Sequence, residues 1–179
     1  MKDLFGENLS EEIDDYKEYL KKYDSETIND RVGRLKYLDK IKSDGYLMTS
    51  GDLELGYTYQ EVQFAFVHGY FLSTLVLAQA FIEKLLQNYF MMNNIKCRRT
   101  FDAMLRYARN HKLFNDYIIR KLDFIRLIRN PITHIKSWEY EHSLDKRSFK
   151  EKKHPLHKLE EDARLAISIL IHVTQKGFE

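Results

Sequence analysis

The chain has 179 residues, of which 44% are hydrophobic and 31% charged, a balance that favours one folded domain over a disordered chain. Seven glycines and two prolines are too few for an all-β fold with many tight turns, and the single cysteine, Cys97, excludes an internal disulfide framework and a cysteine-rich zinc site. The net charge of +2 indicates no partner by itself. Because we find neither a signal peptide nor a run of about 18 apolar residues, we expect a soluble, cytoplasmic protein that does not associate with membranes.

The N-terminal residues 1–50 predict two acidic helices. Ser10 can cap a helix that runs to about residue 22. A second helix is expected over 25–42, ending at the Ser43-Asp44-Gly45 turn. Residues 46–57 include two glycines and are predicted to be a loop. We expect this N-terminal segment to pack on the rest of the chain, residues 58–179.

The remainder of the sequence predicts helices only. Thr58 and Glu61 have the capping-box spacing and are expected to open a long helix that ends near residue 93. Thr100 is expected to cap a helix over 101–111, Asn115 to start another, and Pro155 to lie in the first turn of a last helix ending at residue 177. Residues 138–153 are crowded with charges and are predicted to be a surface loop. The apolar positions of the long helix recur at spacings of three and four: Phe64, Val67, Phe71, Leu75, Ala78, Ile82 and Leu85. No long alternating strand pattern occurs, so we predict an all-α fold with additional N-terminal helices.

Charge is distributed unevenly along the chain. Residues 1–30 hold ten acidic and four basic side chains, whereas residues 95–136 hold eleven basic and three acidic ones. The basic region suits a polyanion such as nucleic acid, because each lysine or arginine at a phosphate releases counterions. The alternative is a solvated basic face whose charge is complementary to that of the acidic N-terminal segment.

One segment, residues 123–135, concentrates side chains that can act on a phosphodiester. On a helix at about 100° per residue, its polar members fall within one arc of roughly 140°: Asp123, Arg126, Arg129, Asn130, Thr133 and His134. The opposite side is apolar and is expected to face the core: Phe124, Leu127, Ile128, Pro131 and Ile135. Pro131 is predicted to kink this helix rather than end it.

Arg129, Asn130 and His134 resemble the Arg-x4-His signature of the HEPN superfamily (higher eukaryote and prokaryote nucleotide-binding domains). Residues 77–86, with Glu83, look like a core helix of that family in which an acidic residue is common, and the resemblance spans about residues 58–176. It implies an all-α, HEPN-like antiparallel helical bundle and a metal-independent ribonuclease of toxin–antitoxin, abortive-infection or phage-defence systems. The partners implied are RNA, a second copy of the chain and an antitoxin or regulatory protein encoded nearby. In one subgroup a tyrosine follows the motif histidine by two positions, and Lys136 stands there instead.

The chemistry explains these residue types without the family. RNA can be cleaved by its own 2′-hydroxyl once a base removes the proton. An imidazole, with an ordinary pKa near 6.5, can take or give that proton, so His134 is the predicted acid/base. The guanidinium of Arg129 can stabilise charge on the phosphorane, and Asn130 can orient the imidazole or bind a phosphate oxygen. Glu83, Arg126 and Lys136 are possible supporting residues.

Several alternatives remain open at this point. A second Arg-x4-His match, Arg106 to His111, is expected to play no part because its helix is short. His142, His154 and His157 have metal-like spacing but no Cys or well-placed carboxylate, so we predict no metal and no cofactor. The chain could instead be a catalytically inactive HEPN module that binds nucleotide or RNA or dimerises, or a helical-bundle interaction protein.

Overall fold

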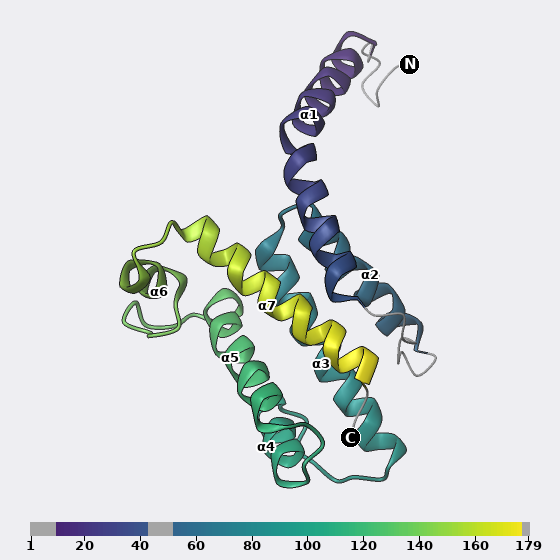
Figure 1. Cartoon of the computed structure of the whole chain (residues 1–179), viewed down its shortest axis with the longest axis vertical. Coiled ribbons are helices and arrows are strands. Elements are labelled where there is room, and N and C mark those ends of the chain that lie inside the picture. The colour runs from purple at the N-terminus through teal and green to yellow at the C-terminus, as the bar shows by residue number, and fades with distance from the viewer. Residues whose placement is uncertain (1–9, 43–51, 177–179) are drawn as a thin grey trace, which may run out of the picture.

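The computed structural model describes residues 10–42 and 52–176, and every regular element within those ranges is a helix (Figure 1). In chain order the helices are α1 (Ser10–Ile41), α2 (Leu53–Val67), α3 (Phe71–Met92), α4 (Phe101–Asn110), α5 (Asp116–Thr133), α6 (Leu144–Glu151) and α7 (Pro155–Lys176). The predicted all-α class is therefore confirmed.

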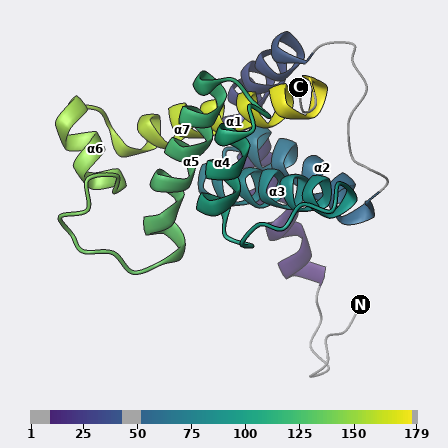
Figure 2. The same ribbon diagram turned by 90° about the horizontal axis from the view of Figure 1, so that it is seen from below.

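Helices α3 and α7 form the centre of the bundle. Helix α3 contacts α2, α4, α5 and α7, while α7 also contacts α2, α5 and α6 (Figures 1 and 2). The core is apolar and drawn from most of these helices, because each turns one stripe of large side chains inward. The bulkiest of its fully buried members include Phe66, Phe81, Leu86, Met104, Ile119, Ile125 and Ile167.

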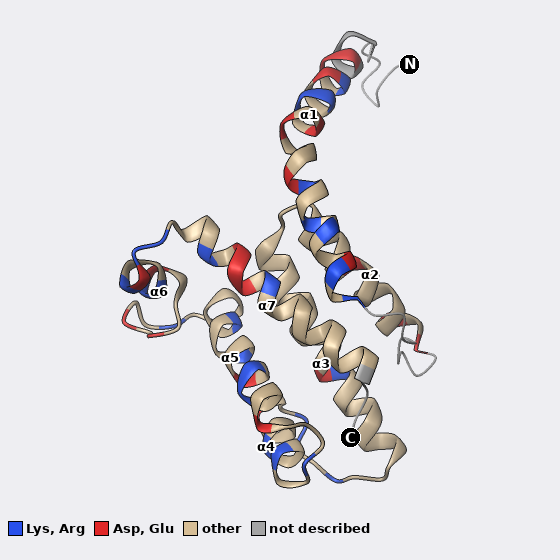
Figure 3. Ribbon diagram, in the orientation of Figure 1, with Lys and Arg blue, Asp and Glu red and all other residues tan. Residues whose placement is uncertain are grey.

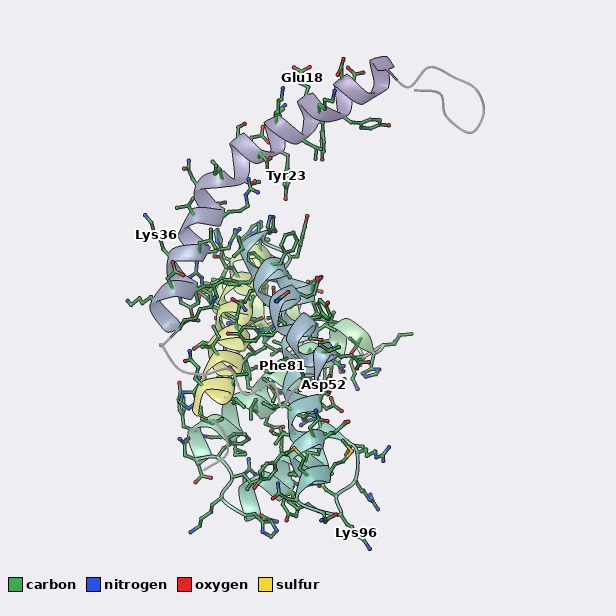
Figure 4. All side chains as sticks on the ribbon, turned by 90° about the vertical axis from the view of Figure 1, so that its right-hand side faces the viewer. Glu18, Tyr23, Lys36, Asp52, Phe81 and Lys96 are labelled. Carbon is green, nitrogen blue, oxygen red and sulfur yellow. The ribbon has the colours of Figure 1, made fainter. Side chains whose placement is uncertain are left out.

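Helix α1 is continuous where two helices were predicted. Ser25 does not interrupt it, because its hydroxyl donates to the carbonyl of Lys22 at 2.7 Å within the helix. Only the last third packs closely on the bundle, through Tyr37, Leu38 and Ile41. The side chains of residues 14–22 are exposed, and this part of α1 projects beyond the bundle (Figures 1 and 4). The expected packing of the N-terminal segment is thus found along the later part of α1, where Tyr23 also forms a side-chain hydrogen bond with Tyr70.

Helix α2 begins earlier than predicted because Asp52, not Thr58, caps it. The Asp52 carboxylate accepts from the backbone N–H groups of Glu54 and Leu55, at 2.9 and 3.2 Å. Asn88 of α3 donates to the same carboxylate at 3.1 Å, which lowers the Asp52 pKa. Thr58 lies inside the helix, where its hydroxyl donates to the Glu54 carbonyl. The residues predicted to form a loop just before residue 52 lie outside the described ranges.

The long helix predicted over 58–93 is broken at residues 68–70. Gly69 has a φ of +81°, a conformation that L side chains rarely adopt, and the chain reverses there to form the α2–α3 hairpin. Arg34 of α1 covers this turn, donating to the carbonyl of Val67 at 3.1 Å. Phe64, expected in the core stripe, is consequently 56% exposed.

The later boundaries follow the sequence more closely. Thr100 and Asn115 cap α4 and α5 with their side chains, and Pro155 is the first residue of α7, as predicted. Residues 138–153 are not all loop, because Ser143 caps α6 by accepting from the Lys146 N–H. A capping serine followed by good helix formers is sufficient to start this short helix.

Candidate functional site

The predicted motif lies at the C-terminal end of α5. Pro131 has no N–H group, so the carbonyl of Leu127 lacks its usual helical donor. The hydroxyl of Tyr140 takes that place, donating to the Leu127 oxygen at 3.2 Å. The helix continues through Pro131 to Thr133, which explains how the proline is accommodated.

His134 lies just beyond the helix rather than on it. Its backbone is extended, with φ −137° and ψ 139°, although its N–H still donates to the Asn130 carbonyl at 2.9 Å. The prediction that His134 continues the helical arc of Arg129 and Asn130 is therefore wrong. The break frees the imidazole from the helix face and leaves His134 exposed.

The buried side of α5 also differs from the predicted one. Its fully buried residues are Ile118, Ile119, Leu122, Ile125 and Ile128. Of the residues expected in the core, Phe124, Leu127 and Pro131 are only half-buried, and Ile135 is fully exposed. The sequence analysis considered only residues close to the motif and did not include Leu122 and Ile125, which are buried one to two turns earlier.

Arg129 lies on this inward side, because it follows Ile125 by four residues. Its side chain is half-buried, and its Nε is buried without a hydrogen-bond partner in the described part of the chain. A buried donor left unpaired costs free energy, and the Nε atoms of Arg31 and Arg34 are in the same state. Asn130 is half-buried on the neighbouring flank.

Arg129, Asn130 and His134 are close in the sequence. In the described part of the chain, their side chains form no hydrogen bond with one another. The Asn130 carbonyl accepts a hydrogen bond from the His134 N–H. Arg129 directly precedes Asn130 and so lies a little more than one helical turn before His134. The arrangement supplies an exposed imidazole and an arginine with an unused donor at the same helix end.

The supporting residues differ in their surroundings. Arg126 is held by Asp123, with its Nε and Nη2 at 2.9 and 2.8 Å from one carboxylate oxygen. Lys136 is exposed, with its ammonium 5.9 Å from the centre of the Tyr140 ring. Binding of a phosphate by Arg126 would therefore compete with Asp123, whereas Lys136 carries no ion pair in the described structure.

Glu83 is not brought to the motif. Helices α3 and α5 run in opposite directions (Figure 1). Leu75 of α3 and Ile128 of α5 line the same cavity. Glu83 lies eight residues beyond Leu75, roughly 12 Å further along α3. Its neighbour Lys84 pairs with Asp52 and Glu54.

The other histidine patterns form no visible site. Arg106 pairs with Asp102 at 2.7 Å, and His111 stacks on Tyr107 with ring centres 4.0 Å apart. The rings of His154 and His157 are 5.8 Å apart. Over the described ranges, no group of three or more His, Cys, Asp or Glu side chains is placed to bind a metal ion.

The basic and acidic regions are separate in space. Figure 3 shows Asp and Glu along the projecting end of α1, and Lys and Arg along α4, α5 and the loop before α4. Among the described residues, α1 forms ion pairs only within itself and, through Arg34, with Glu160 of α7. The basic region is therefore not neutralised by the acidic helix of the same chain.

Sequence reasoning missed a cavity beside the motif. A space of about 710 Å³ lies between α3, α5, α6 and the start of α7, and the segment after His134 forms part of its wall. Trp138 and Phe149, which are 78% and 88% exposed, line it together with Lys136 and Lys146. Large exposed aromatic side chains among lysines were the available signal, and the prediction of a plain surface loop obscured it.

Among the described residues, no helix is both long and apolar enough to cross a bilayer. Comparison with known proteins gives no match to a protein-family model, to a curated protein or to a solved structure.

Proposed function

We propose that this protein is an endoribonuclease that cleaves RNA by attack of the ribose 2′-hydroxyl, without a metal ion. The observation that carries the proposal is the presence, at one end of α5, of an exposed His134 and of a half-buried Arg129 that forms no ion pair in the described structure. The resemblance to the HEPN signature and the excess of basic residues over 95–136 support the same activity.

In the proposed reaction His134 accepts the proton of the 2′-hydroxyl, whose oxygen then bonds to the adjacent phosphorus. The bond to the 5′-oxygen breaks, and that oxygen leaves with a proton supplied by a second acid. The products are a 2′,3′-cyclic phosphate and a 5′-hydroxyl. Arg129 stabilises the charge that builds on the phosphoryl oxygens, and the Asn130 side chain orients the imidazole or binds a phosphate oxygen.

Incubation of the purified protein with mixed RNA tests this proposal. Arg129→Ala and His134→Ala should each abolish cleavage while leaving the helical content unchanged, and Arg129→Lys should fail nearly as badly because it loses the planar fork. Arg106→Ala is the matched control and should cleave normally. Cleavage should persist in chelator; full activity of His134→Ala would refute the assigned role.

The complete site is proposed to form in a homodimer in which two α5 ends face each other across a two-fold axis. One histidine supplies either base or acid, whereas two copies supply both. Mixing the unmodified protein with excess His134→Ala chains should abolish most of the cleavage, because each mixed dimer then holds one histidine instead of two. A protein that is monomeric at micromolar concentration and cleaves at full rate would exclude this arrangement.

The biological role proposed is that of a toxin or phage-defence effector controlled by an antitoxin or regulator encoded nearby. Expression of the unmodified protein in bacterial cells should arrest growth and degrade RNA. Expression of His134→Ala to the same level should do neither. Equal arrest by both proteins would show that toxicity does not come from this site.

A second candidate function, protein binding, is favoured by the projecting part of α1. Tyr16, Tyr19 and Leu20 are 66%, 66% and 58% exposed, and helical spacing puts them on the side that packs on the bundle further along through Tyr37 and Ile41. Clustered exposed apolar side chains are typical of interaction surfaces. Light scattering of the unmodified protein and of Leu20→Lys tests it: an assembly lost in the variant would assign association to α1 rather than to α5.

A further inference from the structure

The cavity beside the motif has a preformed wall. The segment from Ser137 to Ser143 is held at several points: Tyr140 donates through its hydroxyl to α5, the Ser143 N–H donates to the Tyr140 carbonyl at 3.0 Å, and Arg147 donates to the His142 carbonyl at 3.1 Å. Arg147 is itself bound to Asp162 of α7 by two contacts of 2.8 and 2.6 Å. Ligand sites are usually preformed in this way, because little ordering is left to be done on binding.

The inside of the cavity is apolar and its edge is basic. Leu75 and Ile128 are completely buried and form part of its floor, to which Leu159 contributes. Lys136 and Lys146 stand at the edge, against one carboxylate, that of Asp145. A volume of about 710 Å³ falls within the range of small-molecule sites, and this combination suits a flat apolar ring that carries a negative group.

The two aromatic side chains of the cavity, Trp138 and Phe149, indicate more specifically which kind of ligand it prefers. Trp138 is fixed by Lys146, whose ammonium lies 4.6 Å from the ring centre, so one face of the indole is occupied. The other face and the ring of Phe149 offer stacking surfaces. Aromatic side chains beside cations are the usual means of binding unpaired bases, because every base has a stacking face and every linkage a negative phosphate.

We propose that this cavity binds a nucleobase stacked on Trp138 and Phe149, with the adjoining phosphate at Lys136 and Lys146. The inference rests on the proposed ribonuclease function, since Lys136, which lines the cavity, follows His134 by two residues. The same chemistry is offered by a free mononucleotide, and the experiment separates the two sources. An apolar side chain of a protein partner is the competing occupant.

Trp138 is the only tryptophan in the chain, so intrinsic fluorescence reports on this cavity alone. The His134→Ala protein is titrated with a short single-stranded RNA, with the four mononucleotides and with inorganic tripolyphosphate. We expect RNA to quench the emission and tripolyphosphate to leave it unchanged. Quenching by RNA at lower concentration than by any mononucleotide identifies the strand as the ligand; equal quenching identifies the free nucleotide.

Two variants and a control complete the test. Phe149→Ala should weaken RNA binding about tenfold, as loss of one stacking surface does, and Lys146→Met should weaken it several-fold. Lys150→Met, on the same helix but outside the cavity, should bind normally. Circular dichroism establishes that the variants are folded.

The outcomes distinguish this inference from the function on which it rests. If labelled RNA binds, or the unmodified protein cleaves RNA, without any change in Trp138 emission, the cavity assignment is wrong and the nuclease stands. If RNA neither binds nor is cleaved, both fail. Quenching by tripolyphosphate equal to that by RNA would show a site for charge alone and would also overturn the stacked base.

Discussion

The ion pair between Arg147 and Asp162 offers a direct test of how α6 is fixed to α7. The two side chains are 8% and 3% exposed, with contacts of 2.8 and 2.6 Å between their terminal atoms. Replacing Arg147 by Met removes the cation and leaves a buried carboxylate without compensation. Breaking a buried pair in this way costs about 3–5 kcal/mol of unfolding free energy.

For a domain of this size, about 1 kcal/mol shifts the melting temperature by about 2–4 °C, so Arg147→Met should melt roughly 6–20 °C lower. Thermal and urea unfolding followed by circular dichroism measure the two quantities. The double variant Arg147→Met with Asp162→Leu removes both charges and should recover most of the loss, because an apolar pair of similar volume avoids the desolvation cost.

The exposed pair of Arg106 and Asp102 supplies the control. These side chains are 67% and 46% exposed, so Arg106→Met should cost less than about 1 kcal/mol. The reasoning would be refuted if Arg147→Met were no more destabilising than Arg106→Met. It would also fail if the double variant were as unstable as Arg147→Met alone, because the loss would then come from packing rather than from the uncompensated charge.

Three further predictions concern stability. Lys158 lowers the pKa of Glu151 below its ordinary 4.5 by hydrogen bonding, so the interaction stabilises the folded state above about pH 4.5 and this stabilisation is lost on acidification through the folded pKa. When urea unfolding is compared at about pH 6 and pH 3, Lys158→Met should therefore show a smaller decrease in stability than the unmodified protein. Tyr140→Phe should cost about 0.5–1.5 kcal/mol in urea unfolding, since Leu127 loses its donor; an unchanged midpoint would show that water replaces the hydroxyl. Gly69→Ala should lower the free energy of unfolding by about 1–2 kcal/mol, because residue 69 has a φ of +81°. Gly56→Ala is the control: it lies inside α2 with open space around it and should be neutral or stabilising. Equal effects of the two substitutions would contradict the argument.

Helix starts were predicted well where the signal is local. Thr100 and Asn115 cap their helices and Pro155 opens α7 as expected, because a cap depends on a side chain and the N–H groups two or three residues away. The same rule placed the start of α2 at Thr58, which has the right spacing but lies inside the helix. Asp52 took the role because its carboxylate is also bound by Asn88 of α3, a contact that the local sequence does not contain.

The candidate site was partly predictable for the same reason. The sequence indicates that Arg129, Asn130 and His134 lie within about one helical turn and that Pro131 can be tolerated. It does not reveal that the Tyr140 hydroxyl replaces the missing donor, or that the helix ends at Thr133 and leaves His134 extended. The first depends on a loop that returns to α5, because Tyr140 lies 13 residues beyond Leu127 in the chain.

The sequence by itself determined an all-α chain, the caps Thr100 and Asn115 and the residues that make the end of α5 chemically distinctive, because helical periodicity and capping are properties of neighbouring residues. Tertiary structure decided which side of α5 is buried, and it turned Arg129 inward in line with Ile125. It also paired Arg147 with Asp162 and thereby fixed the wall of the cavity beside Trp138. Such outcomes follow from which helices pack together, since burial and charge pairing are decided by contacts between segments that no local pattern encodes.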